Sequence, residues 1–147
     1  MNIDMDSFRE SILGLLVYAH VELGLPVENV LPQIKFVSTE QLQELACEGI
    51  CSDIKGWTTA DDLIYLNNNL DIDIAYDKSI ILHELVHYIQ YKHSLNNYNS
   101  DCITWKSREA QAFQIQINWL QTTKSEYSSL RVNQVMRNFH RIKCPLP

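Results

Sequence analysis

The residues with the clearest chemical meaning are His83, Glu84 and His87, which form the pattern His-Glu-x-x-His. Positions four apart lie on one face of a helix, so the imidazoles of His83 and His87 can reach a single metal ion. A glutamate beside the first histidine can lie next to a metal-bound water and accept its proton. The motif therefore predicts a zinc centre that activates water, with two histidine ligands and Glu84 as general base.

The surroundings of the motif predict a buried helix. Its flanking positions hold the apolar residues Ile80, Ile81, Leu82, Leu85, Val86 and Ile89. Glu84 is the only charged residue between Lys78 and Lys92, with histidine counted as neutral. A glutamate inside a buried helix is costly unless a metal ion or proton transfer uses it. This favours a metal centre over a core helix with two incidental histidines.

A third protein ligand is expected, because catalytic zinc usually has three and keeps one position open. Two candidates remain open. His93 follows His87 at the spacing of the metzincins, but Gln90 stands where those proteins need a glycine that turns the chain back to the metal. Glu109 lies in the next long helix, and two antiparallel helices would place it opposite the histidine pair. The favoured prediction is Glu109, with His93 as the alternative.

The arrangement resembles the gluzincin clan of zinc metallopeptidases, and specifically its minimal single-domain members, over about residues 62–122. The resemblance implies that His83, His87 and Glu109 bind Zn²⁺ and that Glu84 is the base in hydrolysis of a peptide or protein substrate. It also implies that the free backbone groups of the strand before the motif helix pair with the substrate. In this chain that strand is formed by Leu63, Ile64, Tyr65 and Leu66.

The sequence offers several candidates for the supporting roles. A donor to the developing oxyanion is expected. The candidates are Tyr88, Tyr91, Tyr127, His93 and His140. A carboxylate or carbonyl should orient each ligand histidine, and Asp77 and Asp101 are the candidates.

Composition limits the classes of function. The chain of 147 residues suits one domain, 1–147, and its net charge of −6 without a basic stripe argues against a nucleic-acid partner. No apolar run approaches a membrane span, and no cationic leader precedes the first helix. The oligomeric state is not indicated.

The four cysteines could pair as Cys47 with Cys51 and Cys102 with Cys144, or remain free and buried. Pairing would indicate a secreted or extracytoplasmic protein, and free thiols a cytoplasmic one.

Hydrophobic periodicity predicts a mostly helical α+β domain with a small sheet. Helices are expected over 5–23, 38–46, 77–92, 104–122 and 125–140, and strands over 33–37, 55–58 and 63–66. Three other interpretations stay open: a zinc-binding or partner-binding module without catalysis, a latent proenzyme whose residues 1–60 cover the cleft, and a helical interaction domain without metal.

Overall fold

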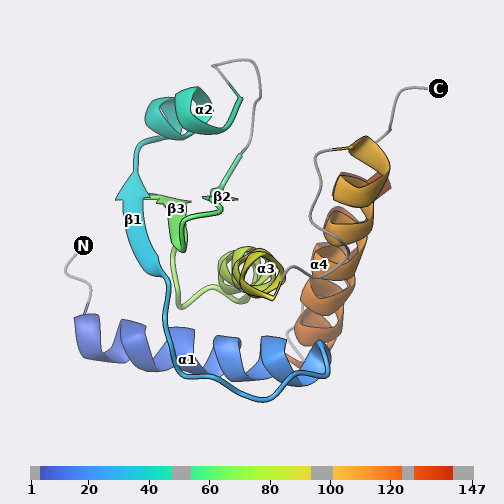
Figure 1. The fold of residues 1–147 in the computed structure, drawn as a ribbon, viewed down its shortest axis with the longest axis horizontal. Coiled ribbons are helices and arrows are strands. Elements are labelled where there is room, and N and C mark those ends of the chain that lie inside the picture. The colour runs from blue at the N-terminus through green and yellow to red at the C-terminus, as the bar shows by residue number, and fades with distance from the viewer. Residues whose placement is uncertain (1–3, 48–53, 94–100, 124–127, 141–147) are drawn as a thin grey trace.

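The computed structural model describes residues 4–47, 54–93, 101–123 and 128–140, and these fold as a mostly helical α+β domain with one small mixed sheet (Figure 1). This confirms the fold class predicted from the sequence. The elements in chain order are α1 (Met5–Glu22), β1 (Gln33–Val37), α2 (Thr39–Cys47), β2 (Gly56–Thr58), β3 (Leu63–Asn67), α3 (Ala75–Lys92), α4 (Cys102–Thr122) and α5 (Ser128–His140).

Local signals explain where the early helices begin and end. The Asp4 side chain accepts hydrogen bonds from two backbone N–H groups in the first turn of α1. Gly24, at a φ of 71°, follows the end of α1 in the left-handed region that glycine tolerates. At α2, the backbone N–H of Ser38 donates to Gln41, whose own N–H donates to the Ser38 hydroxyl. This is the capping box that the sequence predicts.

The motif helix α3 occupies the centre of the molecule (Figure 1). One side of α3 packs against α1, another against α4, and β2 and β3 contact it as well. A helix that is covered on several sides must be apolar nearly all round, which explains the run of buried residues from Ile81 to Gln90. The motif therefore lies on a helix whose position is determined by several neighbouring elements.

The sheet has the strand order β1-β3-β2, which corrects one expectation from the sequence. β3 pairs in parallel with β1 over its whole length and antiparallel with β2 from Ile64 to Leu66. Its backbone groups are therefore engaged on both sides, and Leu63, Ile64, Tyr65 and Leu66 offer no free edge to a substrate. The strand at the edge next to α3 is β2.

Elements from the described part of the first 60 residues contribute to the core and to the sheet. α1 contributes its buried face to the main hydrophobic cluster, and β1 and β2 flank β3. The described residues of this region, 4–47 and 54–60, are therefore built into the fold, and the interpretation that residues 1–60 form a removable cover is not favoured. No helix in the described part of the chain is long and apolar enough to cross a membrane.

Candidate metal centre

Helices α3 and α4 bring three potential metal ligands to one point. The Nε2 atom of His83 lies 3.1 Å from Glu109 Oε2, and the Nε2 atom of His87 lies 2.7 Å from Glu109 Oε1. The two histidine Nε2 atoms are 3.1 Å apart. One ligand atom from each residue lies within 4.8 Å of the others. The structure thus places Glu109 opposite the histidine pair, and these residues could hold a metal ion.

A chain of hydrogen bonds orients His83. Its Nδ1 lies 3.0 Å from Gln116 Oε1, and the Gln116 amide nitrogen donates to the Ser79 hydroxyl. Ser79 in turn donates to the backbone carbonyl of Tyr76. Because the Gln116 nitrogen is committed to donating, its oxygen must accept, and the proton of neutral His83 lies on Nδ1. The lone pair of Nε2 then faces Glu109.

Gln90 does the same for His87. The Gln90 amide nitrogen donates to the Arg108 carbonyl and to Gln111 Oε1, so its oxygen accepts from His87 Nδ1 at 2.8 Å. Sequence reasoning missed both glutamines. Their spacing was the available signal: Gln90 is three residues after His87, and Gln116 is seven after Glu109, so each shares a helix face with a ligand.

The electrostatics of the triad favour a cation at this point. Burial alone would lower the pKa of His87, but the negative charge of Glu109 outweighs it and raises that pKa to about 9. Burial would likewise raise the pKa of the Glu109 carboxyl, but the positive charges of His87 and His83 hold it well below its usual range. In the metal-free protein a proton on His87 supplies the positive charge that a metal ion could replace.

Glu84 lies beside the triad and is not part of it. Its side chain is almost fully buried, and the Thr58 hydroxyl lies 3.0 Å from the Glu84 backbone oxygen and 3.2 Å from Oε2. Burial raises the pKa of this carboxyl, against the opposing charges of His87 and His83. A carboxylate whose pKa is raised accepts protons more readily, which is what a general base requires.

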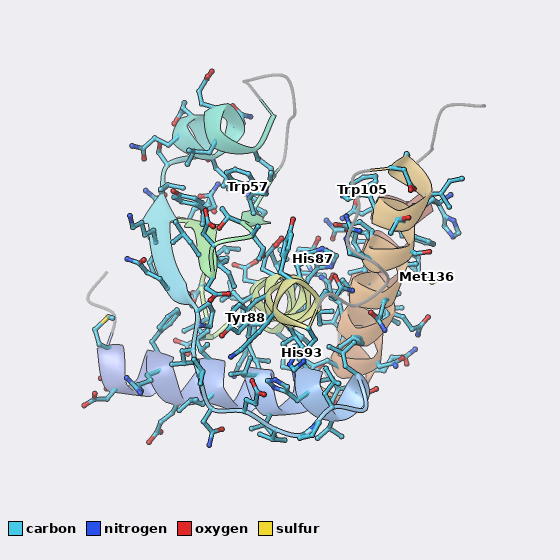
Figure 2. All side chains as sticks on the ribbon, viewed as in Figure 1. Trp57, His87, Tyr88, His93, Trp105 and Met136 are labelled. Carbon is cyan, nitrogen blue, oxygen red and sulfur yellow. The ribbon has the colours of Figure 1, made fainter. Side chains whose placement is uncertain are left out.

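Two cavities meet at Glu84. The smaller, about 160 Å³, extends toward the beginning of α3 and is lined by Tyr76 and Phe113 among others. The larger, about 280 Å³, extends toward the end of α3, with Trp57 and Trp105 on opposite sides of it (Figure 2). Gly56 and Glu84 line both cavities. A molecule that spans the two cavities therefore passes Glu84.

A family model described as a domain of unknown function, DUF6647, matches residues 8–136. The chain belongs to the DUF6647 family. The match runs from α1 into α5, so the α3–α4 site lies within the DUF6647 domain. No curated protein and no solved structure matches the chain.

Most supporting residues expected from the sequence lie elsewhere in the structure. The Tyr88 hydroxyl donates to the Val30 carbonyl, away from the triad, and His140 is exposed at the end of α5. Tyr91 lines the larger cavity, whereas Tyr127 lies outside the described residues. His93 is on the side of α3 that faces α1, whereas His87 is on the side of α4 (Figure 2).

Two aspartates were expected to orient the histidines. One of them caps a loop instead, and the other caps a helix. Asp77 accepts from the backbone N–H of Asp71, and Asp101 accepts from the N–H of Thr104 at the start of α4. Glutamine amides orient both histidines. Each amide oxygen accepts from a histidine while the amide nitrogen donates to another group.

Cys102 is disulfide-bonded, which corrects the alternative in which all four cysteines are free. The side chains of Cys47, Cys51 and Cys144 lie outside the described residues, so the predicted pairings remain predictions.

Proposed function

We propose that this chain is a zinc-dependent metallopeptidase in which His83, His87 and Glu109 hold the metal and Glu84 is the general base. The observation that carries the proposal is the convergence of two histidine nitrogens and a carboxylate from two helices, directly beside a buried carboxylate that is left out of the ligand set. A site that only binds metal has no need of the second carboxylate.

The ligand atoms fit Zn²⁺. In a tetrahedral site with ligands at about 2.0–2.1 Å from zinc, neighbouring ligand atoms lie about 3.3 Å apart. The closest separations here are 3.1, 3.1 and 2.7 Å, so small movements would admit the ion. Two histidines and one glutamate leave a fourth position open. Bound zinc supplies a Lewis acid that makes water acidic near neutral pH and polarises a carbonyl group.

The chain's own residues then position and move protons. Glu84 accepts the proton of the attacking water on its carboxylate and delivers it to the leaving amine. Thr58 fixes the orientation of that carboxylate through its hydroxyl. Gln90 and Gln116 keep the ligand nitrogens directed at the metal position. The donor to the oxyanion is assigned to the tyrosines that line the cavities, Tyr76 and Tyr91.

An extended peptide is the substrate that suits the two cavities and the edge strand. Among the described residues β2 pairs only with β3, which leaves its other edge for strand addition. Gly56 of β2 lies against Glu84, so a peptide paired along β2 passes the base. Pairing with the substrate, which the sequence predicts for β3, is therefore proposed for β2 instead.

The test is digestion of a mixed peptide library by the zinc-loaded protein and by Glu84→Gln, with products identified by mass spectrometry. The wild-type protein should cut peptides, and Glu84→Gln should retain zinc and lose at least a hundredfold in rate. Glu10→Gln, a change on the exposed surface of α1, is the matched control and should cut normally.

Two results would reject the proposal. Equal cleavage by Glu84→Gln would show that Glu84 is not the general base. Stoichiometric zinc in a wild-type protein that cuts none of the library would favour a binding module without catalysis.

A further inference from the structure

A second group of metal-ligating side chains lies on the opposite side of α3, outside the proposed active site. It consists of His20 on α1, Glu28 in the connection between α1 and β1, and His93 at the end of α3. One ligand atom from each of these residues lies within 4.8 Å of the others. The set contains two histidines and one carboxylate, the same donor types as the first centre.

His93 has an unused nitrogen in this group. Its Nε2 is buried and has no hydrogen-bond partner in the described part of the chain. A buried polar atom without a partner costs free energy, and native proteins nearly always supply one, in water or an ion if not in protein. His93 therefore needs a partner, and the nearby carboxylate and imidazole make a metal ion a chemically suitable one.

His20 is prepared to be a ligand. Its side chain is almost fully buried, and its Nδ1 lies 2.8 Å from the Leu16 carbonyl, which can only accept. The proton of the neutral ring is therefore on Nδ1, and the lone pair is on Nε2. This matches the arrangement at the first centre, where an acceptor on Nδ1 leaves Nε2 for the metal.

Glu28 supplies the negative charge, but shares it with Lys92. The Lys92 ammonium lies 3.2 Å from Glu28 Oε2, so one carboxylate oxygen is engaged and the other remains for a metal. A cation next to a metal ligand opposes binding through charge repulsion. The second group should thus bind a divalent ion more weakly than the first.

We infer that His20, Glu28 and His93 form a second zinc site, which ties the end of α3 to α1 and to the connection that leads into the sheet. Two imidazoles with one carboxylate suit zinc better than magnesium or calcium, which prefer oxygen ligands. The inference does not depend on peptidase activity. The effect of the ion is structural: it stabilises the folded chain because His93 is far from His20 and Glu28 in the unfolded one.

The test is calorimetric titration of the metal-free protein with zinc, together with thermal unfolding at each step. The wild-type chain should bind two ions, the second more weakly, and the second should raise the unfolding temperature further. His93→Gln should bind one ion with the affinity of the tighter site. His140→Gln, a change at an exposed histidine, should still bind two.

Two further variants keep the result interpretable if one protein folds poorly. Lys92→Gln removes the competing ammonium and should tighten the weaker site several-fold. Glu109→Gln should lose or weaken the tighter site and retain the weaker one. These variants separate failure of the second site from failure of the first.

Three outcomes would overturn the inference. One is a wild-type chain that binds a single ion, lost in Glu109→Gln and kept in His93→Gln. Another is a second ion that His93→Gln still binds. The third is a Lys92→Gln protein whose weaker site has unchanged affinity.

Discussion

Two glutamine side chains determine what the histidines of the α3–α4 site can do. Gln90 and Gln116 each accept from a ligand Nδ1 while their nitrogens donate elsewhere, so neither amide can rotate without losing hydrogen bonds. Both Nε2 lone pairs are thereby aimed at one point before any metal arrives. Such preorganisation reduces the cost of ordering ligands when the ion binds.

Gln116→Ala and Gln90→Ala should each weaken zinc binding by about 10–100-fold, because groups behind the ligands contribute on that scale. Competition with a chromophoric chelator measures the affinity. Gln114→Ala, at an exposed position of α4, should leave the zinc affinity unchanged. Unchanged zinc affinity in both Gln116→Ala and Gln90→Ala would mean that these amides do not orient the ligand histidines.

Zinc binding should release a proton at pH near 7. The pKa of His87 is raised to about 9 in the metal-free protein, so the ring is protonated at neutral pH, but zinc binds the neutral ring. Affinity should therefore rise as the pH increases toward about 9 and level off above it. Calorimetry in buffers with different ionisation enthalpies measures the released proton. A binding enthalpy that is independent of the buffer would contradict this prediction.

At the scale of elements, the approach of β2 to α3 sets the position of Glu84, the proposed general base. A Cβ atom at Gly56 would lie 3.2 Å from Glu84 Cδ and only 2.7 Å from its Cγ, and the second distance is shorter than the contacts that Cβ atoms make in proteins. The absence of a side chain at Gly56 lets the strand pass next to the carboxylate, where Thr58 also reaches it.

Gly56→Ala should therefore displace Glu84 and reduce peptide hydrolysis by about 100-fold, the cost expected for a misplacement near 1 Å. Zinc content should stay at the wild-type level, because the ligands come from α3 and α4. Gly14→Ala is the control: it has open space and lies within α1, so it should raise stability by about 0.5–1 kcal/mol. Full activity in Gly56→Ala would show that the close approach has no role.

The sequence predicts the bounds of the helices and strands better than it predicts which of them lie side by side. Apolar spacing places α1, α3 and α4 within a few residues of their observed bounds, and the Ser38–Gln41 cap marks α2. Strand order could not be predicted in this way, because no local pattern in Leu63–Asn67 reveals that β3 has a partner on each side. The sequence therefore predicts β3 as the strand that would pair with a substrate, whereas the structure has β3 in the centre of the sheet and β2 at the edge next to α3.

For the molecule as a whole, the core ties the site to the first helix. Leu16 on α1 is fully buried in the cluster that also contains Leu82 and Leu85 of α3. Residues near the start of the chain thus support the helix that carries both histidines. Removal of residues 1–60 should yield an unfolded protein and no gain in activity. Activation by such removal would restore the latent-proenzyme interpretation.

Leu16→Ala should lower the free energy of unfolding by about 2–5 kcal/mol, because it removes a buried side chain and leaves a cavity. Denaturant unfolding of the metal-free protein measures the change. Val17→Ala, at the next and partly exposed position, should cost much less. Equal losses in the two variants would mean that α1 does not pack as described.

Contacts between residues far apart in the sequence limit which site residues could be predicted from the sequence. Glu109 could be anticipated because two consecutive antiparallel helices bring it to the histidines. His93 could not be assigned from the motif alone, since its neighbours His20 and Glu28 are more than sixty residues earlier in the chain. The packing of α1 into the core could not be predicted from the sequence for the same reason.

The most direct test of the metal centre is an anomalous difference map at the zinc absorption edge, from crystals of protein reconstituted with zinc. The proposed metal centre predicts a peak about 2.0–2.2 Å from His83 Nε2, His87 Nε2 and a carboxylate oxygen of Glu109. A map without a peak at that position, or with a peak held by other residues, would contradict it.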